Sequence, residues 1–84
     1  MKYFVYMIEN CTNRHYIGIT TDPKRRLIEH NSGSTKSTMP FRPWKTIYTE
    51  EFESRKEACA REWHLKHNKG YKEKLEIINK YGGK

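Results

Sequence analysis

The apolar positions at the start of the chain predict a β-hairpin. Residues 3–8 form a continuous apolar and aromatic run, which is typical of a strand buried on both faces at the centre of a sheet. The polar residues 9–14 predict a turn. Residues 15–20 then alternate, with Ile17 and Ile19 on one face of the second strand. The opposite face carries Tyr16, Gly18 and Thr20.

Helix signals follow the hairpin. Asp22 can cap free backbone amides, and Pro23 suits the first helical position, so a helix is expected from about Pro23 to about Asn31. Residues 32–43 are rich in Ser and Thr and contain two prolines, which predicts an exposed loop. The β-branched and aromatic residues 44–52 predict a third strand.

Two more helices complete the pattern. Ser54 and Glu57 fit a capping box, which predicts a second helix that reaches about His67. Gly70 should break this helix, and apolar residues at helical spacing predict a third helix that ends at Gly82-Gly83. The expected fold class is α/β in the α+β sense: a small three-stranded antiparallel sheet flanked by helices, in the order β-β-α-β-α-α.

Length and composition set the class of protein. A chain of 84 residues with 35% hydrophobic residues predicts a single domain spanning residues 1–84. Seventeen Lys and Arg against ten Asp and Glu give a net charge of +7, which favours a nucleic-acid partner, DNA in particular. Cys11 and Cys59 fit neither a disulfide framework nor a zinc motif, so a reducing cytoplasmic location is expected. No apolar run is long enough to suggest a membrane partner.

A carboxylate interrupts the apolar arc of the second predicted helix. At about 100° per residue, Glu62 falls between the positions of Ala58 and Cys59. One reading is an ordinary ion pair with Lys66, four residues later. The other is a rigidly held ligand for a hard divalent cation. His64 and His67 lack further metal ligands and are expected to be surface residues.

The first predicted helix carries two groups suited to phosphate. Arg26 and His30 are four residues apart, so they should share a helix face. A solvated basic face would explain them, but a guanidinium that forks onto phosphate oxygens would stabilise charge in phosphodiester hydrolysis. Of the tyrosines, Tyr16 differs because it shares its strand face with Gly18, which lets a substrate approach closely.

These residues together resemble the signature of the GIY-YIG nuclease family, in particular its small single-domain members. The resemblance rests on the ordered set Phe4-Val5-Tyr6, Tyr16-Ile17-Gly18, Thr20, Arg26, His30 and Glu62-Trp63-His64-Leu65-Lys66. The first triplet departs from the family name, which has Gly-Ile before the tyrosine. The resemblance implies hydrolysis of DNA with a tyrosine, an arginine, a glutamate and one divalent cation.

The resemblance assigns a role to each catalytic candidate. Glu62 would hold Mg²⁺ or Mn²⁺, Tyr16 would act as general base with Tyr6 as its companion, and Arg26 would stabilise charge. A phenol has a reference pKa of about 10, so this base requires cations nearby. His30 would orient water, donate to phosphate or cap the helix. The residues expected to contact the nucleic-acid backbone are Arg25, Lys36, Arg42 and Lys45.

Two other functions remain open at this point. The domain could bind nucleic acid without cleaving it, or it could act as an adaptor that needs a protein partner for targeting. Nothing in the sequence resembles a separate DNA-reading domain. For this reason a protein partner that directs the domain to its target remains one of the alternatives.

Overall fold

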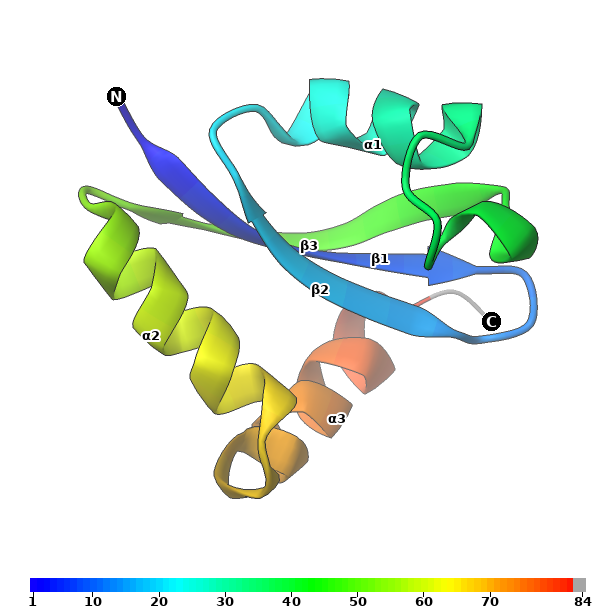
Figure 1. The fold of residues 1–84 in the computed structure, drawn as a ribbon. Helices are drawn as coiled ribbons and strands as arrows, with labels where there is room; N and C mark the ends of the chain where they lie inside the picture. Colours follow the sequence, from blue (N-terminus) through cyan, green and yellow to red (C-terminus); the bar gives the residue numbers. More distant parts are fainter. Residues whose placement is uncertain (83–84) are drawn as a thin grey trace.

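A computed structural model, which describes residues 1–82, shows a three-stranded antiparallel sheet between two helical layers (Figure 1). The strands are β1 (Tyr3–Asn10), β2 (His15–Thr20) and β3 (Trp44–Phe52), and the sheet order is β2-β1-β3. The expected central position of the first strand, the α+β class and the element order β-β-α-β-α-α are confirmed.

The helices cover opposite faces of the sheet. Helix α1 (Pro23–Ser32) lies over one face, and α2 (Arg55–Lys66) and α3 (Tyr71–Tyr81) lie over the other (Figure 1). Two one-turn 3-10 helices, η1 (Met39–Phe41) and η2 (Asn68–Gly70), join these elements. The expected end of the last helix at Gly82-Gly83 is tested only at its first glycine, because Gly83 lies outside the described residues. No helix within residues 1–82 is long and apolar enough to cross a membrane.

Strand alternation divides the core into two clusters. On the side of α2 and α3, the first cluster consists of Val5, Met7, Ile17, Ala58, Leu65 and Ile77. On the side of α1, the second cluster consists of Tyr6, Ile8 and Trp44, with Tyr16, Leu27 and Phe41 packed against them. Because β1 is central, successive residues of this strand are buried alternately against one helical layer and the other.

The first strand is longer than the apolar run that predicted it. Glu9 and Asn10, expected in the turn, continue β1 and are only 3% and 7% exposed. The His15 Nε2 atom lies 2.9 Å from a Glu9 carboxylate oxygen across the hairpin. The Asn10 side chain accepts hydrogen bonds from Thr12 and Arg14 of the turn. Glu9 and Asn10 are polar, which predicted that they would be exposed in the turn. Their hydrogen-bonding partners offset the cost of burying them.

The expectation of an exposed loop at residues 32–43 is wrong in one respect. The segment contains η1, and Thr38 is 1% exposed. The Trp44 indole nitrogen donates to the Thr38 carbonyl oxygen at 2.9 Å, which anchors the loop on the first buried residue of β3. The loop therefore packs against the end of α1 and contributes a side chain to the interior.

Candidate active site

Tyr6 and Tyr16 lie side by side on the sheet face covered by α1. Tyr6 is paired with Gly18 in the β1–β2 register, and the two tyrosine ring centroids are 6.3 Å apart. A Cβ atom on Gly18 would be 2.5 Å from Tyr6 Oη and 2.7 Å from Cζ. The Tyr6 ring therefore lies across β2 at the one position of that strand that has no side chain.

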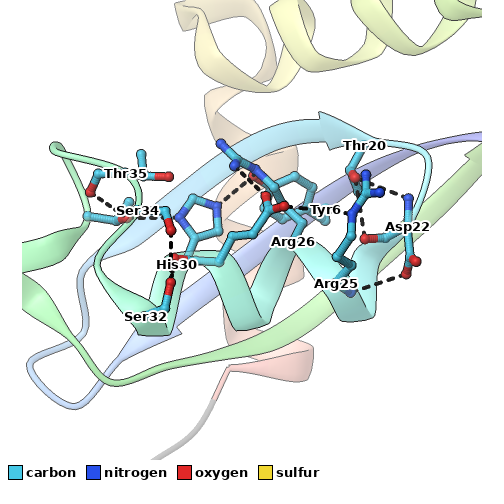
Figure 2. Close-up of polar contacts among 11 residues, drawn as sticks. Tyr6, Thr20, Asp22, Arg25, Arg26, His30, Ser32, Ser34 and Thr35 are labelled. Atoms are coloured by element: carbon cyan, nitrogen blue, oxygen red, sulfur yellow. Dashed lines mark hydrogen bonds and ion pairs between the residues drawn. The ribbon is translucent and has the colours of Figure 1, made fainter.

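Helix α1 presents two polar groups to the Tyr6 hydroxyl (Figure 2). The Nε2 atom of His30 lies 2.8 Å from Tyr6 Oη, and Arg26 Nε donates to the same oxygen at 3.3 Å. Helix geometry explains the pair, because residues four apart lie on one helix face. The helix start is fixed by the Asp22 side chain, which accepts from the Arg25 amide at 3.1 Å, and by Pro23 in the first turn.

His30 shares its helix face with Arg26, as the spacing predicts, but it is buried rather than on a solvated basic face. Its exposed fraction is 0%, and its Nδ1 atom lies 2.8 Å from Thr38 Oγ1. Thr38 Oγ1 also lies 3.4 Å from the Thr35 carbonyl oxygen, to which it donates. His30 Nδ1–H then donates to Thr38, and Nε2 accepts the Tyr6 hydroxyl proton. This assignment gives each of the three protons an acceptor.

The electrostatics of the cluster favour a neutral Tyr6 and a neutral His30. Burial raises the pKa of Tyr6 to about 12, although the Arg26 guanidinium opposes the shift. Burial and the positive charge of Arg26 lower the pKa of His30. Arg26 itself stays charged, since its ion pair with Glu29, at 2.9 Å, raises its pKa. Tyr6 therefore holds its proton and acts as a positioning hydrogen-bond partner within the cluster.

Glu62 reaches the same region from the opposite helical layer. Its carboxylate accepts from Lys66 Nζ at 2.9 Å, the ion pair that helical spacing suggested, and its side chain is 25% exposed. The same ammonium group lies 5.8 Å from the centroid of the Tyr16 ring. Glu62 also contributes, after burial, to the raised pKa of Tyr6. Its carboxylate thus lies beside the β2 edge of the sheet, close to both tyrosines.

The donor set fits a weakly chelated hard cation. Within residues 1–82, no group of three His, Cys, Asp or Glu side chains could hold a metal ion. A divalent cation held by one carboxylate is compatible with this finding, because Mg²⁺ usually keeps several waters and takes further oxygens from substrate phosphates. Glu62 is accessible enough to supply that single ligand, whereas Glu29 is occupied by Arg26 and Arg25.

The residues expected to contact the nucleic-acid backbone lie in three different places. Arg25 is exposed on α1 next to Arg26. Lys36 and Arg42 are exposed in the loop beyond α1, where Arg42 Nε donates to the Met39 carbonyl oxygen at 2.8 Å. Lys45 is not brought to this face. Its register partner is Glu9, so it lies on the sheet face opposite to Tyr6.

Two hollows open elsewhere on the surface. One, of about 420 Å³, is lined by residues around the β1–β2 turn and the start of β3, among them Glu9, Cys11 and Lys45. The other, of about 550 Å³, lies between the start of α1 and the sheet, beside Phe4 and Leu27. Neither is lined by the tyrosines or Glu62.

The sequence did not predict the contacts of two residues near the tyrosines, Thr38 and Lys66. Thr38 lies in a Ser/Thr-rich stretch, and no spacing distinguishes it from its neighbours. Helical spacing predicts Lys66 as an ion-pair partner of Glu62, and the structure shows that it also lies near the Tyr16 ring. The position of Lys66 could have been predicted from helix packing. A helix that packs across β2 directs one side toward that edge strand.

The chain is similar to known proteins over most of its length. Residues 2–76 match the model of the GIY-YIG catalytic domain. The UPF0213 protein YsiG of Lactococcus lactis is 36% identical over 78 residues, which are 92% of this chain and 75% of that protein. A UPF0213 protein of Streptococcus pneumoniae is 44% identical over 69 residues, which are 81% of this chain and 70% of that protein.

A solved structure shows the same fold. The solution structure of the UPF0213 protein BH0048 from Bacillus halodurans matches with a TM-score of 0.59 and 34% sequence identity, covering 98% of this chain and 88% of that one. The matched region includes the tyrosine hairpin, α1 and the helix that carries Glu62. The chain therefore belongs to the GIY-YIG catalytic domain family, alongside the small UPF0213 proteins.

Proposed function

We propose that this protein is an endonuclease that hydrolyses phosphodiester bonds in DNA with one divalent cation. The observation that supports this most is the convergence of Tyr6, Tyr16, Arg26 and Glu62 at the β2 edge from four different elements. Membership of a nuclease-type family agrees with the proposal, and the net charge of +7 suits a polyanionic substrate.

Arg26 and Tyr6 would position the scissile phosphate. Arg26 Nε is oriented by Tyr6, its side chain is 29% exposed, and Glu29 occupies only one of its terminal nitrogens. A guanidinium held in this way can donate further hydrogen bonds to phosphate oxygens as negative charge develops. His30 holds the Tyr6 hydroxyl from the buried side, so its role is to position rather than to contact substrate.

Tyr16 would accept the proton of the attacking water. Its ring is half-buried beside Tyr6 and 5.0 Å from the His30 ring, and Lys66 Nζ places a positive charge 5.8 Å from its centroid. Glu62 would hold Mg²⁺ or Mn²⁺, which when bound polarises a phosphate oxygen and neutralises the charge of the leaving group.

The test is a cleavage assay with matched substitutions. Purified protein is incubated with single-stranded, duplex and branched DNA and with RNA, in Mg²⁺, Mn²⁺ or EDTA. Glu62→Gln should lower the rate by about 100-fold or more, because a bound metal contributes several kcal/mol. Tyr16→Phe should lower it by about 10²–10⁴-fold, the usual contribution of a general base.

Controls with the same chemical change separate catalysis from folding. Glu76→Gln and Tyr71→Phe alter exposed residues of α3 and should leave the rate unchanged. Binding without cleavage of any substrate would refute the nuclease proposal in favour of a binding module. Cleavage that appears only after a cell extract is added would favour the partner-dependent adaptor.

A further inference from the structure

One large aromatic side chain of α2 points away from the core. Trp63 is 55% exposed, whereas the other tryptophan, Trp44, is 6% exposed and bonded through its indole nitrogen. The buried residues of α2 are Ala58 and Leu65, which face the sheet. Arg61 holds the side of α2 next to β3 and α3 through ion pairs with Glu50 and Glu73. Trp63 thus lies on a side of the helix that no other element of residues 1–82 covers.

His67 stacks on Trp63 and fixes its orientation. The ring centroids are 4.1 Å apart and the ring planes differ by 19°. The His67 ring is held in turn, because its Nδ1 atom lies 2.7 Å from the Trp63 carbonyl oxygen. Two flat rings are therefore prearranged at the end of α2, so little rotamer entropy remains to be lost when a further ring stacks on them.

The charge around these rings suits a polyanion. At about 100° per residue, a single arc of α2 and its C-cap carries only cationic, aromatic and small side chains. Its exposed members are Arg55, Lys56, Cys59, Trp63, Lys66 and His67. Within residues 55–67 no carboxylate falls inside this arc, and Glu62 lies at its border. A protein partner of ordinary composition would gain nothing from so uniform a charge, whereas a phosphate backbone would.

The arc adjoins the candidate active site. Glu62 directly precedes Trp63, and Lys66 connects the arc to Tyr16 through its position 5.8 Å from that ring. The helix rises only about 1.5 Å per residue, so Trp63 lies within one turn of the carboxylate. A nucleic-acid strand whose phosphate lies at Arg26 and Glu62 would therefore bring a neighbouring base within reach of Trp63.

We infer that the Trp63–His67 pair is a stacking surface for an unpaired nucleobase next to the cleaved phosphate. The inference rests on the proposed nuclease function for its location but not for its chemistry. Inside a duplex both faces of each base are already stacked on neighbouring base pairs, so an unpaired and unstacked base is the one free to stack on Trp63. The preferred substrate is therefore single-stranded DNA or a junction with a single-stranded arm, rather than an intact duplex.

The test measures binding without cleavage. Anisotropy titrations at fixed salt in EDTA use oligothymidylate, an abasic strand of the same length and a blunt duplex. Trp63→Ala should weaken oligothymidylate binding by about 5- to 150-fold, the range measured for base–aromatic stacking. Trp63→Phe should largely restore it. The matched control is Tyr71→Ala, which removes an exposed aromatic of α3 and should leave binding unchanged.

A second measurement needs no substitution. Oligothymidylate should quench the fluorescence of the exposed Trp63 in the wild-type protein, while the abasic strand should not, and buried Trp44 supplies the unquenched remainder. Equal loss of affinity for oligothymidylate and the abasic strand on Trp63→Ala, or unchanged affinity for both, would overturn the inference. EDTA prevents metal-dependent cleavage, so the titrations test base stacking alone. The stacking inference can therefore be confirmed while the nuclease proposal is refuted, or refuted while the nuclease proposal is confirmed.

Discussion

Replacing Gly18 by alanine should displace Tyr6 and break the polar cluster. The new Cβ atom would lie 2.5 Å, 2.7 Å and 2.8 Å from Oη, Cζ and Cε1 of Tyr6. Carbon atoms in contact prefer about 3.5–4.0 Å, so the ring must move by roughly 1 Å. The hydrogen bond of 2.8 Å to His30 cannot survive that movement without a matching shift of α1.

The expected cost follows from three contributions. Overpacking in a buried site costs about 1–3 kcal/mol, and the lost hydrogen bond costs about 1 kcal/mol. The Gly-to-Ala change itself returns about 0.5–1 kcal/mol in a strand, because glycine loses more backbone entropy on folding. The free energy of unfolding should therefore fall by about 1–3 kcal/mol, a large share of the stability of so small a domain.

A double-mutant cycle measures whether Tyr6 is the cause. Urea unfolding is followed by circular dichroism for the wild type, Gly18→Ala, Tyr6→Leu and the double variant. With leucine at position 6 the clash is gone, so Gly18→Ala should be neutral or slightly stabilising. The coupling energy should be about 2–4 kcal/mol, the overpacking and the lost hydrogen bond together. A coupling energy below about 0.5 kcal/mol would refute the reasoning, since Gly18 would then serve a purpose unrelated to the Tyr6 ring.

Three further predictions concern the neighbours of Tyr6 and Glu62. Thr38→Val leaves the Nδ1 atom of His30 without a buried partner, so urea unfolding should show a loss of about 1–3 kcal/mol; an unchanged midpoint would contradict the bond. Burial lowers the pKa of His30, so the unfolded chain gains its proton first as pH falls. Thermal stability should therefore be complete above the unfolded pKa of about 6.5 and decrease below it, and His30→Gln should reduce this slope; equal slopes would contradict the prediction. Lys66→Met removes a cation from Glu62 and should tighten Mn²⁺ binding by roughly fivefold in a titration, with Lys72→Met on α3 as control; weaker binding would argue that Lys66 does not compete with the metal.

The hairpin illustrates how far local pattern determined the fold. The continuous apolar run and the alternation after it predicted a central strand, a second strand paired with it in a hairpin and the face shared by Tyr16 and Gly18, all of which the structure shows. Side chains of a strand alternate between the two faces with a period of two. Knowing which face is buried is therefore enough to assign every side chain to a face. The helix starts at Asp22 and Ser54 were equally local, because a cap is a contact between residues a few positions apart.

The polar cluster required contacts that no local pattern encodes. The burial of His30 depends on Thr38, eight residues away in a loop that is anchored by Trp44. Lys45 is close to Arg42 in the sequence. In the strand register it pairs with Glu9, so it lies on the sheet face opposite to Tyr6. When several consecutive residues of a strand are polar, their charge and type do not predict which sheet face each side chain lies on.

The sequence by itself determined the order of elements and the tyrosine face of the hairpin, and it supplied the candidate residues for phosphodiester chemistry. Only the tertiary structure decided which of those residues meet, because Tyr6, Arg26 and Glu62 come from β1, α1 and α2, and their approach is set by the packing of the two helices on opposite faces of the sheet. It also decided the protonation of Tyr6, since burial is a property of the folded chain and not of any segment.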